Sequence, residues 1–230
     1  MDKRVVEAEV KNLDEKMMNR IKQCLSNPKY CAYNAKKLFN FKSEKRSNVV
    51  VYTGKILHLD GDKKYSEKSV RYYKSLGLNA IVKNIPENRQ AQLIPSLLEK
   101  YKPDILVLTG HDGMIKKNTG FNDIYNYRNS RYFINGVKEA RKWSKNSKDL
   151  AIFAGACQSY YEAIMSEGAN FASSPGRIMI DFIDPLIVAE RIATTENTKY
   201  LTIQDIKEEL RDGEEGVSGI GVMGKKIIKI

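Results

Sequence analysis

Two matching stretches decide the fold of this chain, 104-DILVLTGHDG-113 and 149-DLAIFAGACQS-159. Each begins with a short apolar run of strand length and continues into small residues. The first then reaches His111, and the second reaches Cys157. Because the carboxyl ends of parallel strands lie on one edge of a sheet, these stretches predict that an imidazole and a thiol meet at that edge.

Strand-like and helix-like segments alternate on both sides of these stretches, which indicates an α/β fold with a mostly parallel sheet sandwiched by helices. A further helix is expected to start just after Cys157, and the glycine-rich segment 212–221 is expected to be a loop. We expect strands at 49–52, 55–59, 80–82, 105–109, 150–154, 169–173 and 227–228, and helices at 66–76, 88–101, 129–144 and 184–193.

The chain is expected to have two parts, a helical N-terminal extension over 1–48 and an α/β domain over 49–230. Apolar residues recur at helical spacing from Val6 to Leu25, which gives a helix with one apolar face. The polar segment 42–48 is typical of a linker between the two parts.

The composition is that of an ordinary globular protein with a basic surface. Its 230 residues carry a formal net charge of +11. The lysines are scattered and are not interleaved with aromatic residues in a recognisable RNA-binding motif, so nucleic-acid binding is not expected as the main function. No apolar run approaches the roughly 18 residues of a membrane span, and the chain is expected to be cytoplasmic when made.

The three cysteines, Cys24, Cys31 and Cys157, are odd in number and widely spaced. This argues against a disulfide framework and for a reducing compartment. Cys24 and Cys31 have no histidine near them and are poorly spaced for zinc, so no metal and no other cofactor is expected.

Cys157 fits the position of a nucleophile at a strand-to-helix turn, where a helix N-terminus would favour its thiolate; the alternative is a buried core cysteine. His111 is surrounded by small and polar residues, which suits a base that holds the thiolate and protonates a leaving amine. Backbone N–H groups of Gly113 and Cys157 would form an oxyanion hole. His58, the other histidine of the chain, is the fallback base.

The order of His111 followed 46 residues later by Cys157, each after an apolar strand, resembles the caspase–hemoglobinase class of cysteine peptidases. The chain departs from that pattern in two places. Asp112 stands between His111 and Gly113, and Gly155 stands where caspases have glutamine. The first departure leaves open which amide would serve the oxyanion.

Five motifs carry a resemblance that covers nearly the whole chain. They are 58-HLDGD-62 with Tyr65, 109-TGHDG-113, 154-AGACQS-159, 172-ASSP-175 and 184-DPLIVAE-190. Together they resemble the YabG family of sporulation-specific peptidases. The resemblance implies a cysteine protease of endospore-forming bacteria, associated with the spore coat, that cleaves coat and cortex-associated proteins after arginine. It also implies that Cys157 is the nucleophile and His111 its partner. Members of the family begin with a small N-terminal domain, which this chain is expected to lack.

A preference for arginine needs a carboxylate, because a guanidinium pairs best with a planar acceptor of two oxygens. Asp60 or Asp62, after the first strand pair, is the favoured candidate, although Asp60-Gly61-Asp62 is also typical of a turn. Asp112, Asp181 and Asp184 are further candidates, and Asp184 fits better as a helix cap ahead of Pro185.

Two rival functions stay open. A flavodoxin-like hydrolase or amidotransferase also places a cysteine at a strand edge, but its histidine usually follows the cysteine, and no histidine follows Cys157 here. A non-enzymatic basic coat scaffold or binding module would have an unreactive Cys157 and would bind an acidic partner in a salt-sensitive way.

Overall fold

A six-stranded sheet forms the centre of the protein, whose computed structural model describes residues 14–23, 50–115, 120–146 and 148–229. The strand order is β3-β2-β4-β5-β6-β8. The first five strands are parallel to one another, and β8 is antiparallel to β6, so the predicted mostly parallel α/β fold is confirmed. The strands are β2 (Ile56–Asp60), β3 (Ala80–Asn84), β4 (Ile105–Thr109), β5 (Ala151–Ala154), β6 (Phe171–Ser173) and β8 (Val217–Gly219).

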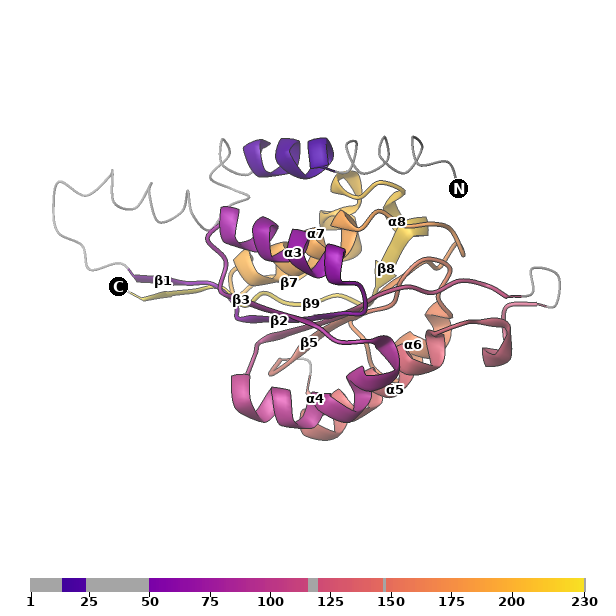
Figure 1. Ribbon diagram of the computed structural model, residues 1–230. Coiled ribbons are helices and arrows are strands. Elements are labelled where there is room, and N and C mark those ends of the chain that lie inside the picture. Colours follow the sequence, from indigo (N-terminus) through magenta and orange to yellow (C-terminus); the bar gives the residue numbers. More distant parts are fainter. Residues whose placement is uncertain (1–13, 24–49, 116–119, 147, 230) are drawn as a thin grey trace, which may run out of the picture.

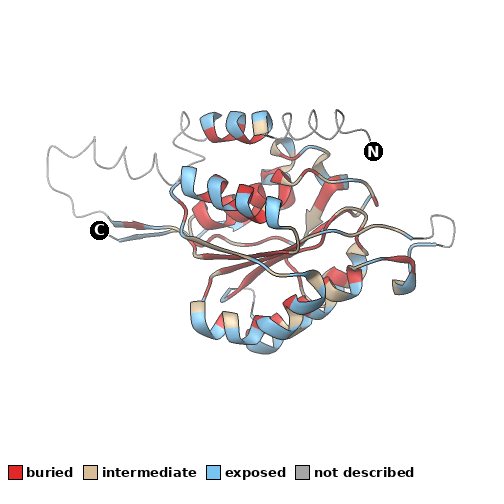
Figure 2. Ribbon diagram, viewed as in Figure 1, coloured by how far each residue is buried: buried red, intermediate tan, exposed pale blue. Residues whose placement is uncertain are grey.

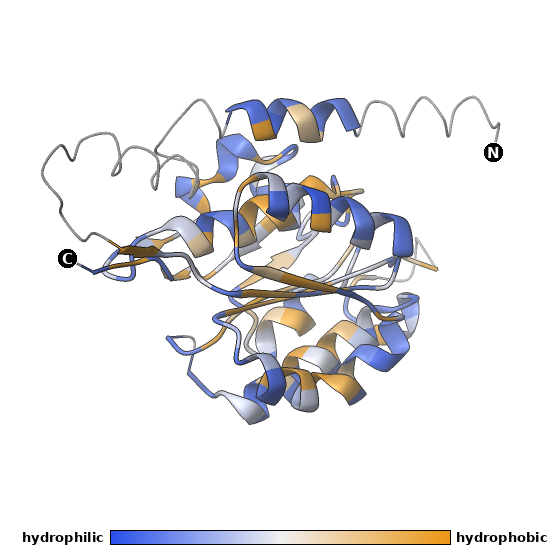
Figure 3. Ribbon diagram, turned by 60° about the vertical axis from the view of Figure 1, so that its left-hand side comes forward, coloured by the Kyte–Doolittle hydropathy of each residue, from blue (hydrophilic) through white to orange (hydrophobic). Residues whose placement is uncertain are grey.

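Helices cover both faces of this sheet (Figure 1). On one face lie α3 (Lys63–Ser75) and α7 (Ile183–Thr194), and on the other lie α4 (Glu87–Tyr101), α5 (Ser130–Trp143) and α6 (Tyr161–Ser166). Side chains alternate along each strand, so Ile105 and Val107 of β4 join the core under α3 and α7, while Leu106 and Leu108 join the core over α4 and α5. Buried residues therefore fill the strands and the inner helix faces (Figure 2), and these surfaces are also the hydrophobic ones (Figure 3).

The register of the parallel strands brings their carboxyl ends level with one another. Asp60 at the end of β2 pairs with Thr109 at the end of β4, and Leu108 pairs with Ala154 at the end of β5. The loops that follow these three strands consequently leave the sheet side by side.

Two short antiparallel ribbons flank the main sheet. The predicted strand at 49–52 is β1 (Val50–Tyr52), which pairs with β10 (Ile227–Lys229) apart from the main sheet. A second ribbon joins β7 (Tyr200–Leu201) to β9 (Val222–Met223). The remaining short elements are the 3-10 turns η1 (Ile124–Asn126), η2 (Ile203–Asp205) and η3 (Lys207–Glu209) and the single turn α8 (Gly213–Gly216).

The prediction of a loop over 212–221 was wrong, because this segment contains α8 and the edge strand β8. Gly219 makes the strand possible. A Cβ at this position would lie 2.1 Å from the carbonyl oxygen of Asn170, so a residue with a side chain could not pair this closely with β6.

Residues 14–23 form a helix, drawn in indigo in Figure 1. Met17 and Ile21 are buried in the same core cluster as α7, which agrees with the predicted apolar face. The rest of 1–48, with Cys24 and Cys31, lies outside the described residues, so the boundary of an N-terminal extension stays a prediction. In the described ranges, no helix is both long and apolar enough to cross a membrane.

Candidate active site

A cavity of about 480 Å³ opens at the carboxyl edge of the sheet. His111, from the loop after β4, and Cys157, from the loop after β5, both line it. The structure therefore places both side chains in the wall of one cavity, and their action as a catalytic pair stays a prediction. Further lining residues come from distant parts of the chain and include Lys16, Asp60, Tyr65, Asp181 and Arg211.

Cys157 is held by a tight turn and is half-buried. Gly155 opens this turn at a φ of +113°, and the thiol of Cys157 points to the carbonyl oxygen of Ile180, 3.8 Å from Sγ. Burial raises the pKa of the Cys157 thiol, so the resting group at neutral pH is the protonated thiol. The sulfur thus needs a base to take its proton before it can act as a nucleophile.

The prediction that a helix starts directly after Cys157 was wrong. The helix α6 begins only at Tyr161, because the chain first turns through Gln158, whose φ is +55°. This helix is also short. Burial rather than a helix dipole therefore dominates the pKa of Cys157, and it acts in the opposite direction.

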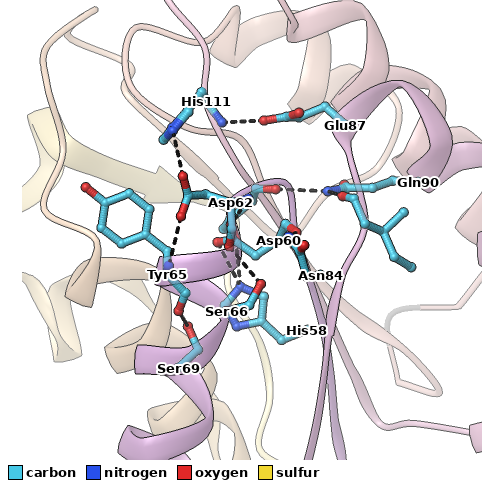
Figure 4. A network of polar contacts seen from close by, with 12 residues as sticks. His58, Asp60, Asp62, Tyr65, Ser66, Ser69, Asn84, Glu87, Gln90 and His111 are labelled. Carbon is cyan, nitrogen blue, oxygen red and sulfur yellow. Dashed lines mark hydrogen bonds and ion pairs between the residues drawn. The ribbon is translucent and has the colours of Figure 1, made fainter.

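His111 is oriented by a carboxylate, as Figure 4 shows. Its Nε2 lies 3.3 Å from Oδ2 of Asp62, whose Oδ1 accepts the backbone N–H of Tyr65 at 3.1 Å and so caps α3. The backbone N–H of His111 donates to Oε1 of Glu87 at 2.6 Å. With Nε2 directed at Asp62, Nδ1 is the ring nitrogen that remains for a thiol or a substrate proton.

Asp112 connects the loop of His111 to the loop of Cys157. Its carboxylate accepts hydrogen bonds from the hydroxyls of Ser130 and Ser159 at 2.5 and 2.9 Å. The Ser159 hydroxyl in turn accepts the N–H of Ala156, next to the cysteine, at 2.9 Å. The residue inserted between His111 and Gly113 therefore fastens the two loops to each other.

The two predicted oxyanion donors differ in their surroundings. The N–H of Gly113 donates to Oδ1 of Asp112 at 2.8 Å, so it is already occupied in this arrangement. The N–H of Cys157 donates to no protein acceptor among the described residues. Cys157 is thus the donor of the pair that is open to a substrate oxygen, and the Gly113 assignment stays a prediction.

His58 also lines the cavity, but it is a poor alternative base because its side chain is buried and both of its ring nitrogens have partners. Thr109 donates its hydroxyl proton to Asp60 at 2.6 Å, so it accepts the Nε2–H of His58 at 2.7 Å. Nδ1 then accepts the hydroxyl of Tyr73 at 3.1 Å. Burial lowers the pKa of His58 to about 3, so this imidazole is neutral at the pH of the cell and serves the packing of β2.

Asp60 and Asp62, the favoured acids for an arginine side chain, already have partners on both oxygens. Asp60 is buried, accepts the N–H of Asp62 at 2.7 Å on Oδ1 and the Thr109 hydroxyl on Oδ2, and burial raises its pKa. With these contacts, Asp60 and Asp62 are better suited to holding the His111 loop in place than to contacting a substrate. Their role in binding arginine stays a prediction.

Sequence reasoning did not select three polar residues of the site. Glu87 opens α4 after the parallel strand β3, so the strand-edge pattern that selected His111 could have found it. Lys16 and Arg211 reach the cavity through long-range packing, and nothing in their local sequence indicates this. In the described part of the chain, no group of three or more His, Cys, Asp or Glu side chains is arranged to hold a metal ion.

The fold and the site define an α/β protein that carries a thiol, an imidazole and carboxylates at the carboxyl edge of a parallel sheet. The family model of the YabG peptidase U57 matches residues 1–229, and the chain belongs to this family. The chain is 40% identical over 171 residues to the sporulation-specific protease YabG of Bacillus subtilis (strain 168). That alignment covers 74% of this chain and 59% of the relative, so the chain spans less than two thirds of the relative's length. No solved structure matches the chain.

Proposed function

We propose that this protein is a sporulation-associated cysteine endopeptidase in which Cys157 is the nucleophile and His111 is the general base and acid. The observation that carries the proposal is that Cys157 and His111 line the same cavity at the carboxyl edge of the sheet. Membership of the YabG peptidase family and the similarity to the sporulation-specific protease YabG of Bacillus subtilis support a protease of sporulation.

The proposed chemistry follows from the protonated thiol. Nδ1 of His111 takes the proton of Cys157 as Sγ attacks the scissile carbonyl carbon, and the N–H of Cys157 faces the developing oxyanion. His111 then returns this proton to the departing amine, which leaves a thioester on Cys157. Water hydrolyses the thioester: His111 takes a proton from the water, the C–S bond breaks, and the proton passes back to sulfur. Asp62 stabilises the imidazolium that forms in both halves of the reaction.

The proposed substrates are spore coat and cortex-associated proteins, cut after arginine, with the enzyme made in the cytoplasm and associated with the coat. The resemblance to the family carries this part of the proposal. The carboxylates in the wall of the cavity are compatible with a basic side chain next to the scissile bond.

Covalent trapping tests the proposal. A peptidyl-arginine chloromethyl ketone is incubated with the full chain, and the thioether formed when sulfur displaces chloride is located by peptide mass mapping. We expect one adduct, on Cys157, and its formation should slow about a hundredfold in His111→Ala. Cys24 and Cys31 are the internal controls. Equal labelling of all three cysteines, at a rate that His111→Ala does not change, would favour the non-enzymatic scaffold.

A further inference from the structure

A lysine of the N-terminal helix reaches into the cavity that contains Cys157. Nζ of Lys16 lies 3.1 Å from Oδ2 of Asp181, and both residues line the cavity. Asp181 directly follows Ile180, whose carbonyl oxygen is the contact of the Cys157 thiol. An acid therefore lies beside the candidate nucleophile, with a cationic side chain of the same protein bound to it.

The nearby cation Arg211 does not compete with Lys16 for Asp181. Its Oδ1 accepts the N–H of Ile183 at 3.3 Å, so the outer oxygen, Oδ2, is the one that faces a cation. The nearby guanidinium of Arg211 pairs instead with Asp212, with 2.5 Å between Nε and Oδ2. Within the described residues, the ion pair of Asp181 is the one with Lys16.

Lys16 can leave this acid without undocking its helix. The side chain of Lys16 is 45% exposed, whereas that of Asp181 is 5% exposed. The helix is held by other residues: Met17 and Ile21 are buried in the core, and Arg20 pairs with Glu209 at 2.6 Å. A half-exposed lysine pair is weak, so a better cation can replace it at little cost.

We propose that Asp181 is the subsite for the basic side chain of the substrate, and that Lys16 occupies this subsite until a substrate arginine displaces it. The proposal rests on the peptidase function proposed above. A guanidinium can form two parallel hydrogen bonds to one carboxylate, whereas an ammonium is a point charge, so arginine competes well with Lys16. Asp60 is less suited, because its partners are a backbone amide and the buried Thr109 hydroxyl, which cannot swing away.

Binding in a background without turnover tests this subsite. The full chain with Cys157→Ala is titrated with N-acetyl-arginine amide and with the neutral N-acetyl-norleucine amide, and affinities are measured by NMR. Adding Lys16→Ala should tighten binding of the arginine ligand about two- to fivefold, because the competing ammonium is gone. Adding Asp181→Asn should weaken it at least about tenfold. Binding of the norleucine ligand should not change.

Lys22→Ala is the matched control, because Lys22 is an exposed lysine of the same helix that does not line the cavity. If Lys16→Ala behaves like Lys22→Ala, or if folded Asp181→Asn keeps its preference for the arginine ligand, the proposal is wrong. If Asp181→Asn does not fold, Lys16→Ala alone decides. Loss of peptidase activity would not affect this binding measurement, so failure of the subsite and failure of the proposed function are distinguishable.

Discussion

Replacing Asp62 by asparagine tests how His111 is held. Oδ2 of Asp62 lies 3.3 Å from Nε2 of the imidazole, and Oδ1 caps α3 through the N–H of Tyr65. Asparagine has almost the same shape and keeps an oxygen for the cap, but it removes the negative charge. Asp62→Asn should therefore reduce the stabilisation of the His111 imidazolium that forms during catalysis, and it should leave α3 intact.

The size of the effect follows from the exposure of the pair. An ion pair between partly exposed side chains contributes about 0.2–1 kcal/mol. The side chains of His111 and Asp62 are 59% and 31% exposed, so solvent screening keeps their pair within this range. We take the upper end of this range, about 1 kcal/mol, which corresponds to about a fivefold fall in kcat. Asp62→Ala should also lose the helix cap, about 1 kcal/mol, and lower Tm by about 2–4 °C.

The assay measures kcat and KM for an arginine-ended fluorogenic peptide together with Tm. Asp62→Asn should show the fall in kcat with KM changed less than about twofold and with Tm unchanged. A large rise in KM at constant kcat would refute this reasoning, because it would mean that Asp62 binds the arginine side chain of the substrate.

Three further predictions concern stability. The folded pKa of His58 is about 3 against 6.5 in the unfolded chain, so its burial removes stability as the pH falls below 6.5, by up to about 1.4 kcal/mol per pH unit. Asp184 has a folded pKa of about 7 against 3.8, so it adds stability as the pH falls from about 7 towards 4. In urea unfolding between pH 7 and 5, Asp184→Asn should lose stability relative to wild type and His58→Gln should gain it; parallel curves for all three proteins would contradict both pKa shifts. Gly155→Ala should lose about 1–3 kcal/mol, since φ there is +113° and the new Cβ would lie 3.2 Å from Cβ of Ser173; wild-type stability of this variant would show that the turn relaxes freely.

The part of the site that the sequence predicted depends on local patterns. His111 and Cys157 each follow an apolar strand and small residues, and parallel pairing then places both at one edge of the sheet. The burial of His58 could also have been found. In β2 it alternates with Leu57 and Leu59 and shares a face with Ile56, which is the pattern of a core position.

The parts that could not be predicted depend on contacts between distant segments. Lys16 and Asp181 are 165 positions apart, and neither neighbourhood indicates the other. The strand β8 was hidden in a glycine-rich segment because its pairing depends on the close approach of Gly219 to Asn170. The direction of the pKa shift of Cys157 depends on how deeply the turn is covered, which the residues of the turn do not determine.

The most direct test of the central claim is turnover of an arginine-ended fluorogenic peptide and its lysine counterpart by wild type and by Cys157→Ala. We predict Cys157-dependent cleavage that prefers arginine, with an inactive variant whose Tm stays close to that of wild type. Cleavage that survives in Cys157→Ala would contradict the assignment of the nucleophile. Failure of the wild type to cleave either peptide, with Cys157 also slow towards iodoacetamide, would contradict the peptidase function of this chain.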